Sequence, residues 1–262
     1  MTDLDHRQEV ATRVALAAGR LAREFFERRH ELAVERKGMQ DLVSVADKSV
    51  EELIRRELGA AFPEDAFLGE EGGGGEAPHL WIIDPIDGTA NFLRGLPYWC
   101  CVIAYVVDGV TELAFTMDPV HDELFVARRG QGAIRNGTPI RISGRDDARE
   151  SCVGLSFNFK LPGERYVSLV DGLVGAGFDH RRMGSSALAL CHVADSRLDG
   201  AVIPLCSSWD VIAGLLTVES AGGLATRWTD GCSLTGSRAV AAATPGIAPA
   251  LERVAGVSLR AG

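Results

Sequence analysis

Residues 81–92 read Trp-Ile-Ile-Asp-Pro-Ile-Asp-Gly-Thr-Ala-Asn-Phe. The apolar run before Asp84 is rich in β-forming residues and predicts a short buried strand that ends at this carboxylate. Pro85 has no backbone donor, so we expect it to end the pairing of the strand and to turn the chain. Gly88 permits a tight backbone, and Asp87 or Thr89 is placed to cap a new helix. Such a strand end offers carboxylates for metal ions on one side and backbone amides for a phosphate on the other.

A second acidic strand end comes shortly before this stretch. Phe67-Leu68 predicts a short strand, and Gly69-Glu70-Glu71-Gly72 follows it directly. We expect the two strand ends to lie side by side, which would bring Glu70 close to Asp84.

Composition limits the classes of protein and partner. The chain has 262 residues, 46% apolar and 24% charged, which is typical of a globular protein that buries a large core. Its formal charge of −9 argues against a nucleic-acid partner but not against a phosphorylated substrate, because metal ions can invert the local field. No apolar run approaches the ~20 residues of a membrane span, and no signal peptide is visible. We therefore expect a cytoplasmic protein that does not bind membranes.

Hydrophobic periodicity predicts an α/β fold with mixed sheets. Long amphipathic helices are expected over residues 5–36 and 46–60, the second capped by Ser44 or Asp47. Strands after residue 98, with a hairpin at 108–109, predict an antiparallel meander. Strands and helices alternate in the remainder, where a strongly apolar helix opens at 209–210. The polar stretch 144–150 suggests two halves, 1–145 and 146–262, that form one compact unit.

The acidic residues at predicted element ends suggest a metal site. If they converge, each like-charge pair at about 4 Å costs roughly 4 kcal/mol at an effective dielectric near 20, so the cluster needs cations. An all-oxygen donor set favours Mg²⁺ or Mn²⁺ over Zn²⁺. Two ions bridged by a carboxylate can activate water and stabilise the leaving oxygen in phosphoryl transfer. The residues concerned are Asp47, Glu70, Glu71, Asp84, Asp87 and Asp210.

Taken together, the motifs closely resemble the inositol monophosphatase family, in its order and approximate spacing and over nearly the whole chain. The resemblance implies an αβαβα sandwich, with mixed sheets between helix layers. It also implies a Mg²⁺-dependent phosphatase that uses two or three ions, acts on a small phosphorylated metabolite and forms a homodimer. The segments that carry it are Asp41-x-Val43-x-x-x-Asp47, Gly69-Glu70-Glu71, residues 81–92, Gly184-Ser185-Ser186-Ala187, Trp209-Asp210-x-x-Ala213-Gly214 and Glu219-Ser220-Ala221-Gly222-Gly223.

The resemblance also implies a ligand set for the ions. Glu70, Asp84 and the Ile86 carbonyl would bind a first Mg²⁺, which lowers the pKa of the attacking water. Asp84, Asp87 and Asp210 would bind a second ion that faces the ester oxygen. Glu70 would share a third ion through water.

Further roles follow from the same resemblance. Thr89 and Asp47 would orient and deprotonate the nucleophilic water, and the Gly88 and Thr89 amides would hold the phosphate. Glu71 and Lys37 are expected to contact the metal ligands without binding the ions themselves. The products would be an alcohol and inorganic phosphate, without a phosphoenzyme.

One departure from the family concerns the substrate. Members that act on inositol phosphate carry a Glu seven residues before the Asp of the Trp-Asp pair, where this chain has Ile203. An aliphatic side chain cannot accept hydrogen bonds from ring hydroxyls. Ser185 and Ser186 are the expected contacts of the alcohol portion, with Ile203 beside them. Histidinol phosphate, a sugar phosphate and 3′-phosphoadenosine 5′-phosphate stay open alongside inositol 1-phosphate.

Two other classes of function fit the sequence less well. Haloacid-dehalogenase-type chemistry needs two Asp residues two positions apart, whereas Asp84 and Asp87 are three apart with Pro85 between them. A non-catalytic regulatory protein would be favoured by a degenerate site, yet every expected metal carboxylate is present.

Overall fold

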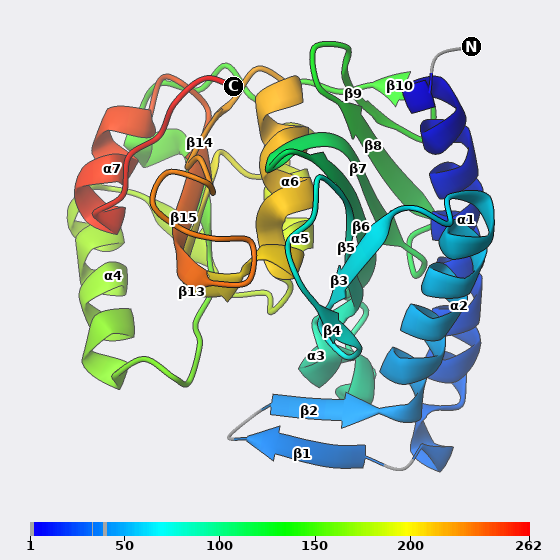
Figure 1. The fold of residues 1–262 in the computed structure, drawn as a ribbon. Helices are drawn as coiled ribbons and strands as arrows, with labels where there is room; N and C mark the ends of the chain where they lie inside the picture. The colour runs from blue at the N-terminus through cyan, green and yellow to red at the C-terminus, as the bar shows by residue number, and fades with distance from the viewer. Residues whose placement is uncertain (1–2, 33, 39–40) are drawn as a thin grey trace.

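The protein consists of five layers, in the order helices, sheet, helices, sheet, helices (Figure 1). The computed structural model describes residues 3–32, 34–38 and 41–262, with the side chains of 34–38 and 41–43 outside the described part. Both large sheets are mixed, because β3 pairs in parallel with β5 in the first, and β11 pairs in parallel with β13 in the second. The αβαβα sandwich expected from the family resemblance is confirmed.

The first half of the chain builds two of these layers. Helices α1 (Asp3–Glu27) and α2 (Val45–Ala61) cover the outer face of an eight-stranded sheet of order β10-β9-β8-β7-β6-β5-β3-β4. Its strands are β3 (Ala66–Gly69), β4 (Gly73–Gly74), β5 (His79–Asp87), β6 (Cys100–Val107), β7 (Val110–Asp118), β8 (Glu123–Arg128), β9 (Gly132–Arg135) and β10 (Thr138–Pro139). The short helix α3 (Thr89–Arg94) follows β5, and β1 (Val34–Gly38) pairs with β2 (Asp41–Ser44) as a separate ribbon.

The second half supplies the other three layers. Helices α5 (Ser186–Ala194) and α6 (Ser208–Ser220) lie between the two sheets, and α4 (Gly163–Gly175) and α7 (Ala248–Ala255) cover the far side. The second sheet has the order β12-β11-β13-β15-β14. Its strands are β11 (Cys152–Leu155), β12 (Asp179–Arg181), β13 (Gly200–Ser207), β14 (Leu224–Ala225) and β15 (Ser237–Ala243).

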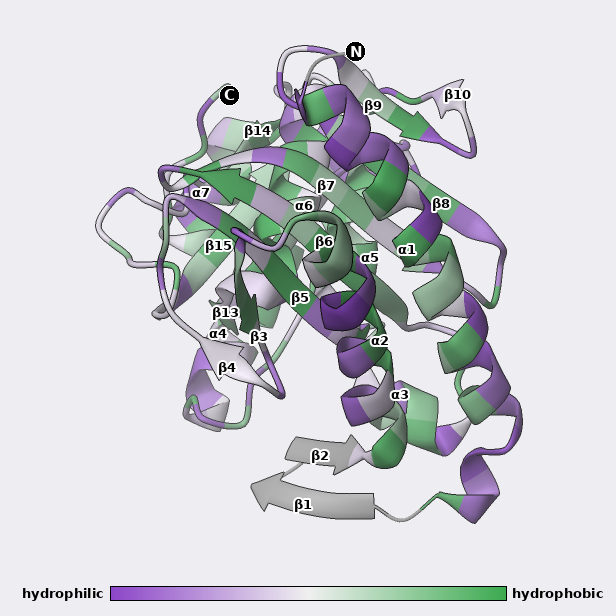
Figure 2. Cartoon of the chain, turned by 45° about the vertical axis from the view of Figure 1, so that its right-hand side comes forward, coloured by the Kyte–Doolittle hydropathy of each residue, from purple (hydrophilic) through white to green (hydrophobic). Residues whose placement is uncertain are grey.

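Apolar side chains fill the space between successive layers. Along β5, Leu80 and Ile82 join the central core around α5 and α6, whereas Trp81 and Ile83 join the core beneath α1 and α2. This alternation is the period of two that a strand covered on both faces requires. Figure 2 shows the resulting apolar faces of the helices and strands.

Several local predictions are confirmed. Ser44 caps α2 and forms a capping box with Asp47. Asp108 and Gly109 turn the β6–β7 hairpin with φ values of +47° and +80°, and β6 to β10 form the expected antiparallel meander.

The first helix is shorter than predicted, since α1 ends at Glu27 and not near residue 36. Its last turn carries Glu24 and Glu27 and no base, which is unfavourable at the negative end of a helix dipole. The Arg28 amide then bonds back to the Phe25 carbonyl at 3.1 Å, a three-residue step that leads into the 3₁₀ turn η1 (Arg29–Glu31).

A buried arginine fastens α1 to the first sheet. Arg7 is 8% exposed, and its guanidinium carbon lies 4.4 Å and 4.5 Å from the ring centroids of Phe62 and Tyr105. It donates to Asp65, whose Oδ2 also accepts the indole N–H of Trp81 at 2.8 Å. The carboxylate is therefore paired and hydrogen-bonded, as a buried charge must be.

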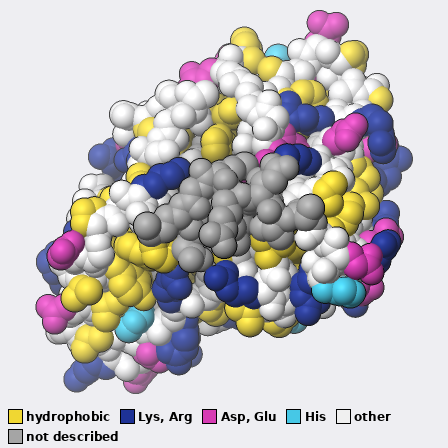
Figure 3. Space-filling view, turned by 90° about the horizontal axis from the view of Figure 1, so that it is seen from below, with side chains coloured by type: hydrophobic (Ala, Val, Ile, Leu, Met, Phe, Trp, Pro, Cys, Tyr) yellow, Lys and Arg dark blue, Asp and Glu magenta, His cyan; other side chains and the backbone are white. Residues whose placement is uncertain are grey.

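The surface carries charges of both signs. On the face seen from below, basic, acidic and apolar side chains are interspersed around the grey segment (Figure 3). Among the described residues, no helix is long and apolar enough to cross a bilayer.

Candidate active site

A β-bulge places Asp84 and Asp87 on the same face of β5. Asp84 lies opposite Val102 and Asp87 opposite Cys100, so three residue steps on β5 match two on β6. In a regular strand, residues three apart point to opposite faces, and the one extra residue restores a common face. Pro85 lies inside this bulge and does not end the strand, which corrects the prediction that it would stop the pairing.

The end of β3 lies beside Asp84, as expected. Gly69 pairs with Ile83, and the Glu70 amide donates to the Ile83 carbonyl at 3.2 Å. β3 and β5 are parallel, so their ends lie at the same edge of the sheet. Glu70, directly after β3, is therefore next to Asp84, the last residue of β5 before the bulge.

The start of α6 brings a third element to this edge. Ser207 is its N-cap, and Asp210 accepts the Ser207 amide at 2.8 Å in a capping box. The carboxylate thus stands at the positive end of the helix dipole, where an anion is stabilised.

Burial and neighbouring carboxylates raise the pKa of Asp84 well above its usual range. Its side chain is 1% exposed, and the loss of solvation is the largest cause. Repulsion from Glu70, Asp87 and Asp210 adds to the shift. One oxygen of Asp84 accepts the Ile86 amide at 2.9 Å. Three carboxylates, from β5, the end of β3 and the start of α6, therefore act on Asp84 at this sheet edge.

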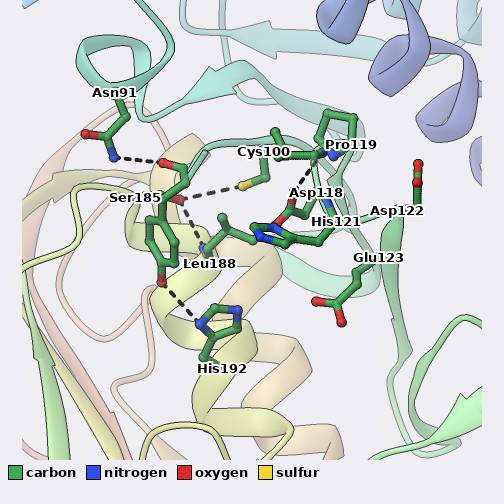
Figure 4. Close-up of polar contacts among 12 residues, drawn as sticks. Asn91, Cys100, Asp118, Pro119, His121, Asp122, Glu123, Ser185, Leu188 and His192 are labelled. Atoms are coloured by element: carbon green, nitrogen blue, oxygen red, sulfur yellow. Dashed lines mark hydrogen bonds and ion pairs between the residues drawn. The ribbon is translucent and has the colours of Figure 1, made fainter. Parts of the chain in front are cut away.

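Asp87 is held by residues of the second half. Its Oδ2 accepts the hydroxyl of Ser185 at 2.5 Å and the amide of Ala187 at 2.7 Å, and the thiol of Cys100 lies at 4.0 Å. Burial raises the pKa of Asp87 to about 6, and the bonds from Ser185 and Ala187 oppose the rise. Figure 4 shows Ser185 between Cys100 and Leu188, whose amide it accepts at 3.2 Å as the N-cap of α5.

The side chains of Asp47 and Thr89 approach each other near the Ile86 carbonyl. The Thr89 hydroxyl lies 2.9 Å from the Ile86 carbonyl and 3.3 Å from Asp47 Oδ1. Asp47 Oδ2 accepts both the amide and the hydroxyl of Ser44 at 2.8 Å. Burial is the largest cause that raises the pKa of Asp47, and the charge of Glu71 adds to it.

The turn between these groups depends on glycine. Gly88 is the N-cap of α3 with φ +100°, so neither Asp87 nor Thr89 caps this helix, contrary to the prediction. A Cβ at this position would lie 3.1 Å from the Tyr98 carbonyl and 3.3 Å from the Gly184 carbonyl. Gly88 therefore permits both the left-handed backbone and the close approach of the two halves.

The donor set fits a hard divalent cation. The groups around Asp84 are carboxylates, which are ligands that Mg²⁺ and Mn²⁺ accept. Over the described ranges, no group of three or more Asp, Glu, His and Cys side chains is arranged so that it could hold a metal ion. The ligand roles given above to Glu70, Asp84, Ile86, Asp87 and Asp210 thus stay predictions.

Comparison with known proteins identifies the relationship. The model of the inositol monophosphatase family matches residues 3–256. The chain belongs to this family. The Nus factor SuhB of Pseudomonas aeruginosa is 38% identical over 229 residues, 84% of each chain.

Solved structures of similar proteins share the fold. The extragenic suppressor protein suhB from Bartonella henselae superposes with a TM-score of 0.86 and is 32% identical, covering 94% of this chain and 96% of that one. The inositol monophosphatase from Anabaena (Nostoc) sp. PCC 7120 superposes with a TM-score of 0.81 at 32% identity, covering 97% and 96%. The family membership and the α/β fold inferred from the motifs are confirmed.

For this family member, the predicted substrate contacts differ in accessibility. Ser185 is 2% exposed and donates to Asp87, and its contact with the alcohol portion stays a prediction. Ser186 is half-buried, with its hydroxyl 3.3 Å from that of Ser156. Ile203 is 1% exposed and belongs to the central apolar core, so its burial does not support a substrate contact.

Glu71 and Lys37, which were expected to support the metal ligands, lie on different elements. Glu71 is half-buried at the end of β3, with its amide bonded to Glu51. Lys37 lies in β1, and its side chain is outside the described part of the structure.

Sequence reasoning missed three residues around the site. Glu51 on α2 is 2% exposed and accepts amides of the 71–72 turn; its spacing of four from Asp47 on a buried stripe was an available signal. Asn91 donates to the Tyr98 carbonyl at 2.8 Å and to the Met183 carbonyl at 2.7 Å, which ties α3 to the segment before Ser185.

The third is His192 on α5 (Figure 4). Its Nδ1 lies 3.3 Å from the Tyr98 hydroxyl, and its Nε2 lies 3.1 Å from Arg197 Nη1. Burial, together with the charge of Arg197, lowers the pKa of His192 to about 4, so the ring is neutral near pH 7.

Proposed function

We propose that the protein is a Mg²⁺-dependent phosphomonoesterase that hydrolyses a small phosphorylated alcohol to the alcohol and phosphate. The observation that carries this proposal is the meeting of Glu70, Asp84, Asp87 and Asp210 at one sheet edge. Like charges in such a site repel strongly, and divalent cations relieve the repulsion. Membership of a family of phosphatases supports the same reaction class.

The ligands would divide between two ions, with Asp84 available to both. Glu70 and the Ile86 carbonyl would complete the first set, and Asp87 and Asp210 the second, with a third ion or Mn²⁺ as further options. When bound, Mg²⁺ neutralises the phosphate charge and lowers the pKa of a bound water. The protein contributes the fixed positions: β3, β5 and α6 each end or begin at this point.

Asp47 and Thr89 would handle the water and its proton. The Thr89 hydroxyl has one proton, so it donates either to Ile86 O or to Asp47 and can orient a water with its lone pairs. Asp47, whose pKa is raised by burial, is the acceptor suited to take the proton of that water. The Gly88 and Thr89 amides at the start of α3 would receive phosphate oxygens.

The alcohol portion would meet Ser186 in the second half. Inositol 1-phosphate is the reference substrate, since the Anabaena relative is an inositol monophosphatase. The absence of a carboxylate at Ile203 favours wider testing, with histidinol phosphate, sugar phosphates and 3′-phosphoadenosine 5′-phosphate as alternatives.

A phosphate-release panel tests the proposal. The pure protein with Mg²⁺ is expected to release phosphate from at least one of these esters, and EDTA to abolish the release. Asp84→Asn should lower the rate at least about a hundredfold, because loss of groups that merely support a ligand already costs 10- to 100-fold. Full activity in Asp84→Asn would refute the assignment, and an inert wild type would refute the function.

A second candidate is a regulatory binding role. Its specific support is that the relatives from Pseudomonas aeruginosa and Escherichia coli are both named Nus factor SuhB. Such a role would leave a partner complex intact in Asp84→Asn while phosphate release is lost. Pull-down of the wild type and this variant from the native cell extract separates the two functions.

Three further properties are proposed with the enzyme. It acts in the cytoplasm, it forms a homodimer, and its halves 1–145 and 146–262 close over the site as one unit. Cell fractionation tests the first, sedimentation equilibrium the second, and coincident unfolding of both halves the third.

A further inference from the structure

Glu51 carries a buried charge for which the proposed reaction has no use. It lies on α2 one turn after Asp47 and is 2% exposed. A buried carboxylate is costly unless donors surround it. The groups that donate to Glu51 therefore indicate which part of the chain this carboxylate positions.

The donors come from the turn that carries Glu70. Glu51 Oε2 accepts the amide of Glu71 at 2.9 Å, and Oε1 accepts the amide of Gly72 at 2.9 Å. Arg55 Nε donates to the same Oε1 at 2.7 Å, and its Nη2 reaches the Gly73 carbonyl at 2.7 Å. Both carboxylate oxygens thus hold consecutive backbone groups after β3.

Glycine lets the turn rest directly on this carboxylate. A Cβ at Gly69 would lie 2.2 Å from Glu51 Oε1, and one at Gly72 would lie 2.6 Å from it. Neither glycine has a positive φ, so contact and not backbone conformation is the constraint. On its other side, Glu70 bonds through its amide to Ile83 of β5. The backbone of Glu70 is therefore fixed between β5 and Glu51.

We propose that Glu51 is a positioning residue, which holds the 69–73 turn so that Glu70 faces Asp84 across the cation site. This inference rests on the proposed function. A carboxylate suits the task because each of its oxygens accepts, whereas an amide of the same size accepts through only one atom. Arg55 extends the grip to Gly73.

The test compares Glu51→Gln with Glu52→Gln, a matched loss of charge at an exposed neighbour. In the metal-free protein, hydrogen–deuterium exchange of the 70–74 amides should rise roughly ten- to a hundredfold in Glu51→Gln alone, the effect of losing a charged hydrogen bond. In calorimetric titration with Mg²⁺, the Kd should rise roughly tenfold. The kcat of Glu51→Gln should be lower than that of the wild type, and this difference should become smaller at high Mg²⁺ concentration. The KM for the ester should stay unchanged.

The outcomes separate the two proposals. A wild type that neither binds Mg²⁺ nor releases phosphate overturns the proposed function. A competent wild type with unchanged exchange and Mg²⁺ affinity in Glu51→Gln overturns the role of Glu51. Should that variant fail to fold, Gly72→Ala displaces the turn from the other side and must produce the same two changes; unaltered values there would also refute the role.

Discussion

Replacing Ser185 by alanine removes two hydrogen bonds at once. The cap bond to the Leu188 amide, 3.2 Å long, contributes about 1 kcal/mol to a typical helix. The bond to the Asp87 carboxylate, 2.5 Å long, belongs to the charged class that contributes about 1.5–3 kcal/mol. The two contributions sum to about 2.5–4 kcal/mol, and because Asp87 keeps the Ala187 amide we expect a loss near the lower end, about 2.5–3 kcal/mol. The free energy of unfolding of such proteins is about 5–15 kcal/mol, which makes this loss readily measurable.

Urea unfolding followed by tryptophan fluorescence measures the effect. The matched control is Ser186→Ala, because Ser186 is only half-buried and contacts another hydroxyl at 3.3 Å. It should change the unfolding free energy by at most about 0.5 kcal/mol. A loss below about 1 kcal/mol in Ser185→Ala would refute the account of Asp87 as a group held by the second half.

The same pair of variants separates two roles in catalysis. Ser185→Ala should raise the Mg²⁺ concentration needed for half-maximal rate, because Asp87 loses its shortest bond. Ser186→Ala should instead raise KM if Ser186 contacts the alcohol. The opposite assignment of effects would support Ser185 as a substrate contact.

Three other predictions concern contacts outside the carboxylate cluster. Asp65→Asn leaves the buried Arg7 with only the exposed Asp3 as a charged partner and should lower the free energy of unfolding by about 3 kcal/mol in thermal unfolding; a loss under 1 kcal/mol would show that the Arg7–Asp65 pair has no structural role. Asn91→Ala should lower the free energy of unfolding by about 1–2 kcal/mol, since two partly buried carbonyls lose their donor, and an unchanged urea midpoint would contradict this. The pKa of His192 is about 4 in the folded chain and about 6.5 when unfolded, so the unfolded state binds the proton first and stability falls as the pH drops from 6.5 to 4. His192→Gln should flatten that acid limb by up to about 3 kcal/mol, and an identical pH profile in the variant would show that His192 does not contribute.

Local patterns were sufficient to predict most of the fold. The capped start of α2, the 108–109 hairpin and the apolar α6 all depend on residues close in sequence. The end of α1 was not predictable in this way, because the stripe that defines the helix fades gradually after Phe25. The β1–β2 ribbon was missed because its residues show no clear alternation.

The site was predictable in its residue types and less so in its contacts. The positions of Glu70 and Asp84 followed from two strand ends close in the chain. The partners of Asp87 did not, because Ser185 and Ala187 reach it only through tertiary packing. The bulge at Pro85 likewise depends on the pairing of β5 with β6, which a single strand cannot reveal.

The distance in sequence between Asp87 and its donors has a consequence during synthesis. The residues that satisfy its carboxylate follow 98 and 100 positions later. At about 5–20 residues per second, they leave the ribosome roughly 5–20 seconds after Asp87 does. During that interval, the nascent first sheet presents at the end of β5 a carboxylate that lacks its two closest donors. The first half therefore cannot complete its own interior, and its final packing waits for the chain segment that begins α5.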